Sequence, residues 1–402
     1  MFSQSPPATA DVVVIGAGIV GACCGYELAA RGLSVLIVDR GAVAAGTTAA
    51  GEGNLLVSDK TPGPELTLAT LSLALWRELP DRLTADLGHV PDLELEDKGG
   101  LMVARTEAAA TALRALAETQ RKAGVTADEV AADAVPELEP HLTRELATTV
   151  YYPQDQQVQP VLAATAILAA AVARGATVAP DAEVTGVERT TGGLRVQTTT
   201  GPVSTPAVVV AAGPWSGRIA ALAQGRLPVE PRRGLVLVTE PLPPTVRHKV
   251  YDAGYVADVG SADAGLASSA VVEATRAGTV LIGSTRERIG FDDSVRVAAL
   301  RLLAAGAVAL FPVLGAATAI RAYGGFRPYS PDHLPVIGPD PAVPGLWYAT
   351  GHEGAGIGLA PATGRLLGEL FVGAPPSTDP TPFAADRPSL SAAAPSTVGD
   401  TE

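Results

Sequence analysis

Residues 12–40 read VVVIGAGIVGACCGYELAARGLSVLIVDR, and this stretch decides the fold. An apolar run at residues 12–15 leads into a glycine-rich turn at residues 16–21. A helical pattern, a second apolar run and Asp39 follow. This order of strand, glycine turn, helix, strand and acidic residue is that of the first βαβ unit of a dinucleotide-binding fold. The stretch therefore predicts a nucleotide site in this part of the chain.

Each glycine of the turn has a separate expected role. Gly16 permits the tight turn, Gly18 lets a pyrophosphate approach the backbone, and Gly21 lets the helix pack closely on the strand. The first N–H groups of the helix and the positive end of its dipole are expected to bind the phosphates. Asp39 is expected to accept hydrogen bonds from both hydroxyls of a ribose and to disfavour a 2′-phosphate.

The composition argues against several classes of protein and site. The 402 residues carry a formal net charge of −13, which argues against nucleic acid or an anionic membrane surface as a partner. The only cysteines, Cys23 and Cys24, are adjacent on the predicted helix and cannot pair with each other. They are also too few for an iron–sulfur cluster or a structural zinc site. We therefore expect two buried thiols, no metal site and a reduced, cytoplasmic setting.

No export signal or membrane span is expected. Residues 1–10 lack a basic segment followed by an apolar core. Residues 302–320 are uncharged, but Pro312 interrupts them, and Gly306 and Gly315 flank the interruption. This pattern favours a buried helix, a turn and a strand over a membrane span.

A second glycine-rich helix start, GHEGAGIGLAPATG, occupies residues 351–364. Its N–H groups at residues 354–357 can meet an electron-rich or anionic atom. FAD is long enough to contact both helix starts, and a positive dipole beside the flavin N1/C2 carbonyl stabilises the reduced ring. Another buried strand, at residues 207–212, runs into Gly213-Pro214-Trp215, where the strand end is either a ligand-binding edge or only a turn.

The predicted secondary structure changes near residue 227. Strand patterns then follow one another without helices, at residues 229–239, 250–259, 268–275 and 279–284, which indicates a mostly antiparallel sheet. The expected fold class is α/β, with a discontinuous Rossmann-like FAD-binding domain and a second α+β substrate domain on that antiparallel sheet. The expected segments are 1–85, 153–226 and 325–387 for the first domain, 86–152 and 227–324 for the second, and 388–402 for a disordered tail.

Four motifs carry a resemblance to a known family. They are residues 16–21 with Asp39, residues 46–55, residues 211–215, and GGFRPYSPDHLPVIG at 324–338 joined to the second glycine-rich block. Over roughly residues 11–370 the sequence resembles the glycine oxidase, D-amino-acid oxidase and sarcosine oxidase superfamily of FAD-dependent amine oxidoreductases. Residues 268–292 look most like the flavin subunits of bacterial amino-acid dehydrogenases, such as D-hydroxyproline dehydrogenase, opine oxidase and hydrogen cyanide synthase.

The resemblance implies a set of residues around the cofactor. FAD is expected to be noncovalent, because no cysteine stands in the strand before the arginine motif. Glu52 occupies a position where a small residue is usual. The implied cofactor contacts are Gly16, Gly18, Ile19, Val20, Gly21, Asp39, Arg40, Thr47, Thr48, Gly53, Asn54, Leu55, Val184, Ala212, Gly213, Trp215, Gly354, Ala355, Gly356 and Ile357.

The resemblance also implies substrate-facing residues. Arg327, in the Gly-x-Arg-Pro motif, matches the arginine that binds a substrate carboxylate, for which a planar two-pronged donor is well suited. The alternative is a structural arginine paired with a carboxylate of the protein. Tyr251 and Tyr255 are expected on one face of a strand, as a cap on the substrate or as buried sheet aromatics. His352, in the flavin-facing loop, is expected to touch the ring or the substrate.

The expected reaction is oxidation of the C–N bond of an amino acid or secondary amine to an imine, by hydride transfer to flavin N5. The substrate classes considered are glycine, sarcosine, D-amino acids, proline and opines. One alternative is an FAD-carrying subunit of a redox complex that has no independent catalysis. Another is a nicotinamide-dependent dehydrogenase, which leaves residues 351–364 without a role. The resemblance makes a second flavin subunit and a small iron–sulfur subunit plausible partners, and a homo-oligomer is also compatible.

Overall fold

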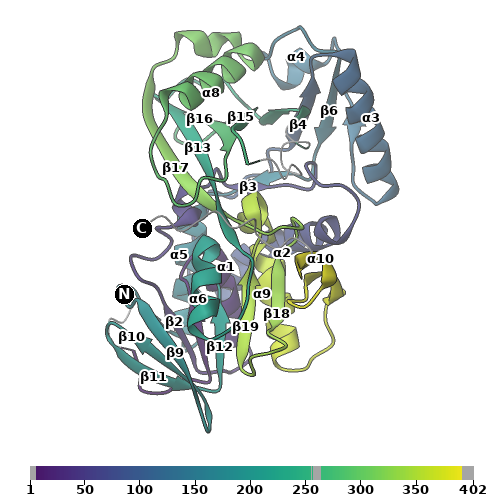
Figure 1. Cartoon of the computed structure of the whole chain (residues 1–402). Helices are drawn as coiled ribbons and strands as arrows, with labels where there is room; N and C mark the ends of the chain where they lie inside the picture. Colours follow the sequence, from purple (N-terminus) through teal and green to yellow (C-terminus); the bar gives the residue numbers. More distant parts are fainter. Residues whose placement is uncertain (1–5, 255, 257–263, 392–402) are drawn as a thin grey trace.

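The computed structural model describes residues 6–254, 256 and 264–391. The chain forms two parts that meet along one side (Figure 1). One is built on a six-stranded sheet with a three-stranded sheet beside it, and the other on an eight-stranded sheet. The short strands β3 (Asn54–Leu55) and β7 (Gln156–Gln157) pair with each other in a separate small sheet.

The six-stranded sheet has the order β18-β19-β12-β1-β2-β8. Its strands are parallel except β18, which runs antiparallel to β19. Every residue of β1, β2 and β12 is buried, as expected for strands that are covered on both faces. The strands are β1 (Val12–Ile15), β2 (Val35–Val38), β8 (Thr177–Ala179), β12 (Ala207–Val210), β18 (Val336–Pro339) and β19 (Leu346–Thr350).

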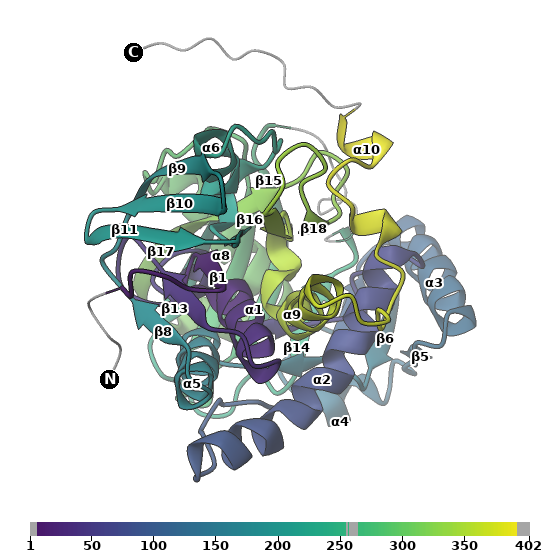
Figure 2. The same cartoon turned by 90° about the horizontal axis from the view of Figure 1, so that it is seen from below.

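Alternate residues of β1 face two different cores. Val12 and Val14 pack in the core that contains α1, α5 and α9, the helices that lie together in Figure 2. Val13 and Ile15 pack in the core beneath the three-stranded sheet and α6. The elements involved are α1 (Ile19–Ala30), α5 (Pro160–Ala173), α6 (Ser216–Leu222), α9 (Gly356–Phe371), β9 (Val184–Thr190), β10 (Gly193–Thr198) and β11 (Gly201–Thr205).

The eight-stranded sheet has the order β17-β13-β16-β15-β14-β4-β6-β5 and is mostly antiparallel. The pairing of β14 with β4 is its parallel exception. One face packs on α8 (Val297–Leu310), and the other faces the first part of the molecule. The strands are β4 (Gly100–Ala104), β5 (Asp128–Glu129), β6 (Thr148–Tyr152), β13 (Glu230–Thr239), β14 (Lys249–Asp252), β15 (Ala267–Ala274), β16 (Val280–Arg286) and β17 (Ala319–Tyr329).

The remaining helices cover the outside of both parts or connect them. The α-helices are α2 (Pro64–Leu87), α3 (Glu107–Lys122), α4 (Val135–Leu138) and α10 (Pro388–Ser391). The 3-10 helices are η1 (Thr47–Ala50), η2 (Gly213–Trp215), η3 (Pro312–Ala316), η4 (Glu353–Ala355) and η5 (Thr381–Phe383). Cys23 and Cys24 are buried thiols on α1, as predicted.

The expected fold class is confirmed, and the main differences concern element ends. Strand β14 ends at Asp252 instead of continuing to residue 259, so the expected stretch that would carry Tyr255 is not a strand as far as it is described. Strand β17 continues to Tyr329, which places Arg327 within a strand. Residues 388–391 form α10, against the expectation of disorder there; residues 392–402 lie outside the described part.

Residues 302–320, the uncharged stretch, follow the expected pattern of helix, turn and strand, as the end of α8, then η3, then the start of β17. Within the residues that the structure describes, no helix is both long and apolar enough to cross a membrane. The six-stranded sheet takes strands from all three expected segments of the first domain: β1 and β2, then β8 and β12, then β18 and β19. We propose the domain division on this basis.

Candidate active site

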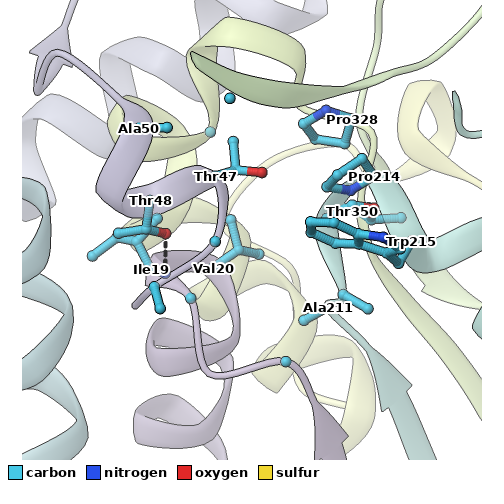
Figure 3. Close-up of a pocket in the computed structure, with 18 of the residues that line it drawn as sticks. Ile19, Val20, Thr47, Thr48, Ala50, Ala211, Pro214, Trp215, Pro328 and Thr350 are labelled. Atoms are coloured by element: carbon cyan, nitrogen blue, oxygen red, sulfur yellow. Dashed lines mark hydrogen bonds between the residues drawn. The ribbon is translucent and has the colours of Figure 1, made fainter. Parts of the chain in front are cut away.

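A cavity of about 500 Å³ lies where the two parts of the molecule meet. The carboxyl ends of β1, β2 and β12 form one side of it, as expected for a ligand site in an open α/β sheet. The inner face of the eight-stranded sheet contributes Gly234, Val236, Gly325 and Arg327. Figure 3 shows the side with Ile19 and Thr48, and Trp215 across the cavity from them.

The glycine turn after β1 could not hold larger residues. Gly16 has φ +114°, and a Cβ there would lie 2.4 Å from the carbonyl oxygen of Ala211. A Cβ on Gly21 would lie 1.8 Å from the oxygen of Gly16, so this glycine lets α1 pack against the end of β1. A Cβ on Gly18 would approach the Thr48 hydroxyl at 3.0 Å. These distances agree with a turn that must lack side chains so that a phosphate group can approach its backbone.

Two threonines connect the neighbouring loop to the turn and to the second sheet. The backbone N–H of Ile19, at the start of α1, donates to Thr48 Oγ1 at 3.0 Å (Figure 3). Thr47 donates its hydroxyl to the carbonyl oxygen of Phe326 at 2.7 Å. Because Phe326 precedes Arg327, this bond links the cofactor loop directly to the predicted substrate-binding strand.

Asp39 is held rigidly at the end of β2. Its Oδ2 accepts from the backbone N–H of Ala17 at 2.8 Å, and its Oδ1 accepts from that of Gly41 at 3.1 Å. Each carboxylate oxygen can accept more than one hydrogen bond. The side chain therefore fits the expected contact with two ribose hydroxyls.

Two arginines and two aromatic rings form a layered cluster at the cavity. The Arg40 guanidinium lies 3.9 Å from the ring centre of Trp215. Trp215 stacks on Phe291, with ring centres 5.2 Å apart and planes 14° apart, and Arg218 lies 4.5 Å from the Phe291 ring. Arg40, Arg218 and Trp215 all line the cavity. This positive charge suits the pyrophosphate of FAD.

The second glycine-rich loop reaches the cavity at the start of α9. Gly354, Gly356 and Ile357 are in its lining. The loop is fixed by Glu353, whose carboxylate lies 3.2 Å from Arg232 Nη1 and 2.8 Å from His333 Nδ1. Both helix N-termini expected from the sequence therefore open into one cavity, whose donor groups fit the two ends of an FAD molecule.

His352 lies in the cavity wall but is buried. Its Nε2 is 2.9 Å from Thr363 Oγ1, and burial lowers the pKa of the imidazole to about 3. The ring is therefore neutral at neutral pH and contributes no positive charge. Its position supports a structural role beside the flavin loop.

Arg327 projects from β17 into the cavity wall. Its Nη1 donates to the carbonyl oxygen of Thr285 on β16 at 2.9 Å. Strands β13 and β17 pair with Gly234 opposite Gly325 and Arg232 opposite Arg327. The guanidinium lies across Gly234, where a Cβ would come within 2.2 Å of Nη1.

Four predicted residues lie elsewhere. Leu55 is fully buried in the core, Gly21 faces Gly16, and Ala355 faces a second, much smaller hollow. Tyr251 is also fully buried and donates its hydroxyl to Ser58, so it is outside the cavity lining. Strand β14 ends at Asp252, and Tyr255, which was predicted to share a strand face with Tyr251, lies outside the described residues.

All the other predicted cofactor residues line the cavity. They are Gly16, Gly18, Ile19, Val20, Asp39, Arg40, Thr47, Thr48, Gly53, Asn54, Val184, Ala212, Gly213, Trp215, Gly354, Gly356 and Ile357. The lining also contains residues whose role was not predicted from the sequence: Arg218, Gly234, Val236, Gly325 and the unusual Glu52. Glycines within predicted strands can signal a close approach, but the register that places Gly234 opposite Gly325 is not visible in the sequence.

The comparison with known proteins agrees with this geometry. The family description "FAD dependent oxidoreductase" (DAO) matches residues 11–370. The chain belongs to this family. FAD is therefore its cofactor, and the expected class of enzyme, an FAD-dependent oxidoreductase, is confirmed.

Individual relatives match over almost the whole chain. A glycine oxidase of Pseudomonas putida is 32% identical over 93% of this chain and 98% of its own length. A hydrogen cyanide synthase subunit of Pseudomonas aeruginosa is 29% identical over 94% of this chain and 96% of its own. The crystal structure of glycine oxidase from Geobacillus kaustophilus superposes with a TM-score of 0.86, at 30% identity, over 95% of this chain and 99% of that chain.

Proposed function

We propose that this enzyme oxidises the C–N bond of a small amino acid or secondary amine to an imine, which water then hydrolyses. The observation that carries the proposal is the Arg327 guanidinium in the wall of the cavity that both glycine-rich loops enter. The similarity to glycine oxidases over nearly the whole chain supports the same reaction class.

In this proposal Arg327 binds the substrate carboxylate. A guanidinium is planar, stays charged at any working pH and has five N–H donors. The hydrogen bond from Nη1 to Thr285 fixes its orientation, and the pairing of β17 with β13 fixes its depth in the cavity. A carboxylate held in this way presents the Cα hydrogen in one direction, and this orientation itself lowers the barrier.

FAD, when bound, supplies the hydride acceptor. Gly354 and Gly356, at the start of α9, present backbone N–H groups and the positive end of the helix dipole to the cavity. The ion pair of Glu353 with Arg232 and its contact with His333 Nδ1 keep this loop in place. The apolar side chains of Ile357 and Val236, also in the lining, help to exclude water from the reacting carbon.

A second candidate function is a subunit of a larger redox complex. The match to a hydrogen cyanide synthase subunit favours it. In that case the chain binds FAD but passes electrons to another subunit, or needs that subunit before it reacts with an amine. Reduction of the isolated chain by an amine, followed by a slow reaction with oxygen, would indicate that a partner takes the electrons.

The direct test of the carboxylate site is Arg327→Met. We expect kcat/KM for the preferred amino acid to fall about thirtyfold or more, because loss of one partner of a buried charged pair costs about 2–5 kcal/mol. The FAD content should stay near that of the wild type. Arg321→Met, at an exposed position six residues earlier on β17, is the matched control. Unchanged efficiency in Arg327→Met would contradict the assignment.

A further inference from the structure

Glu52 is a carboxylate in the cavity wall, and within the described part of the chain its Oε1 has no hydrogen-bond partner. Its Oε1 is buried from solvent. A buried, ionised oxygen without a donor is costly, so such groups are normally paired. Oε1 is enclosed against Gly283, but Glu52 as a whole is only partly buried and lines the cavity, so the rest of its carboxylate is the part that a ligand there can reach.

The position of Glu52 relative to Arg327 suggests which ligand group that is. Both side chains meet strand β16: Arg327 donates to Thr285, and Glu52 Oε1 lies against Gly283, where a Cβ would be 1.9 Å away. Thr285 and Gly283 are two residues apart on one strand. A positive and a negative group therefore lie along one edge of the cavity, which matches the two charges of an amino acid.

The charges behind Glu52 are already balanced. Lys249 pairs with Glu273 at 3.1 Å, and both side chains are almost fully buried. Lys98 pairs with Glu96 at 3.2 Å. The negative charge of Glu52 is thus in excess in this group. The pKa of Glu273 is raised to about 7, chiefly by burial; Lys249 lowers it and the nearby charge of Glu52 raises it, so the two carboxylates are close enough to interact.

The loop that carries Glu52 is held in place from the same side. Lys249 donates to the side-chain oxygen of Asn54, which also lines the cavity. A Cβ on Gly53 would lie 1.9 Å from the oxygen of Val158, so the backbone at this point is closely packed. The carboxylate is therefore presented on a fixed backbone, as a recognition group requires.

We propose that Glu52 binds the amine of the substrate, so that an α-amino acid is held as a zwitterion between Glu52 and Arg327. This inference rests on the proposed function and names its substrate class: compounds that carry a carboxylate and a basic nitrogen on the same carbon. An acid in which an ether oxygen replaces that nitrogen offers Glu52 no donor, and it is rejected.

Pairs of isosteric ligands test this role in the FAD-loaded enzyme. Sarcosine is compared with methoxyacetate, and proline with tetrahydro-2-furoate; within each pair an ether oxygen replaces the N–H group. Affinities are measured anaerobically as Kd values from the perturbed flavin absorbance or from calorimetry, with KM for any amine that is oxidised. Glu52→Gln keeps the size of the side chain and removes its charge. Glu118→Gln, at an exposed carboxylate on α3, is the control.

We expect Glu52→Gln to weaken amine binding about tenfold or more, since hydrogen bonds to charged groups are the strong ones. The Kd of each ether for Glu52→Gln should lie within about twofold of the wild-type value, or fall below it because the repulsive charge is gone. The control should alter neither value. Because the predicted effect is confined to the amines, a general disturbance of the cavity cannot produce it.

Other results would overturn the inference. Equal weakening of amines and ethers would indicate a structural role for Glu52, and unchanged amine binding would remove any role in recognition. If the wild type binds these amines but no amine or amino acid of the classes considered reduces its flavin, the proposed function fails, while the amine-to-ether ratio still decides the role of Glu52. No measurable affinity of the wild type for either amine contradicts the inference itself.

Discussion

The Arg327 guanidinium lies across the Cα of Gly234, so closely that a Cβ at position 234 would come within 2.2 Å of Nη1. The two residues belong to adjacent antiparallel strands, β17 and β13. A glycine within a strand weakens it and is kept where something must approach the backbone. Here the group that approaches is the predicted carboxylate-binding side chain.

Gly234→Ala should therefore displace Arg327 without unfolding the protein. The clash involves the far end of a long side chain, which can move at little cost. We expect KM for the preferred amino acid to rise about tenfold, with the FAD content and the free energy of unfolding changed by less than about 1 kcal/mol. Gly186→Ala, in strand β9 with ordinary spacing around the new Cβ, is the control. An unchanged KM would show that the placement of Arg327 over Gly234 has no bearing on binding.

Gly16→Ala, in contrast to Gly234→Ala, should mainly reduce FAD binding and stability. The new Cβ would lie 2.4 Å from the backbone oxygen of Ala211, and φ is +114°, so neither side can adjust cheaply. We expect loss of most bound FAD, measured as the ratio of flavin to protein absorbance, and a lower melting temperature. Gly32 also has a positive φ, +82°, but a Cβ there would have no atom within 4 Å. Gly32→Ala should therefore lower the free energy of unfolding by only about 1 kcal/mol and retain FAD. Similar flavin ratios in the two variants would contradict the close-approach argument.

The pair of Lys249 and Glu273 provides a test of buried charge. The distance between Lys249 Nζ and Glu273 Oε2 is 3.1 Å, and both side chains are almost fully buried. Lys249→Met leaves the Glu273 carboxylate without its cation and should lower the free energy of unfolding by about 3–5 kcal/mol. The double variant with Glu273→Leu should recover most of this loss. A double variant as unstable as the single one would mean that packing, and not charge, accounts for the effect.

His352 gives the protein a predictable acid sensitivity. Its pKa falls from 6.5 to about 3 because the ring is buried. Below pH 6.5 the unfolded chain takes up a proton that the folded protein does not, so the free energy of unfolding falls as the pH is lowered toward 3. Between pH 7.5 and 5.0 this single group should cost about 2 kcal/mol.

The variant His352→Gln should lack that contribution. We expect the wild type to lose about 2 kcal/mol more than the variant between the two pH values, by urea unfolding. The buried carboxyls with raised pKa, Glu273 and Asp155, act in the opposite direction but are common to both proteins. Parallel pH profiles for the wild type and the variant would contradict a buried neutral His352.

Much of the cofactor site could be predicted from local sequence. The turn at Gly16 and the second helix start at Gly356 are contiguous segments whose function depends on their own backbone. The length of β17 could not be predicted in this way. Gly324, Gly325 and Pro328 are poor strand residues, but pairing with β13 over ten positions keeps this segment extended.

The misplaced residues have a similar cause. Of the two alternatives for Tyr251, a cap on the substrate and a buried sheet aromatic, the structure shows the second, with the hydroxyl donating to Ser58. Leu55, adjacent to Asn54 in the cavity wall, points into the core because successive side chains of a strand face opposite sides. Partners that are distant in sequence decide such orientations, and a single sequence does not reveal them.

Whether this enzyme oxidises a C–N bond is decided by anaerobic mixing of the FAD-loaded protein with amino acids and amines while the flavin band is recorded. The panel is glycine, sarcosine, both proline isomers, D-amino acids and opines. We predict that one of these classes bleaches the flavin, and that Arg327→Met slows this bleaching about thirtyfold or more at low substrate concentration. A fully loaded flavin that no compound on the panel reduces would contradict the proposed function.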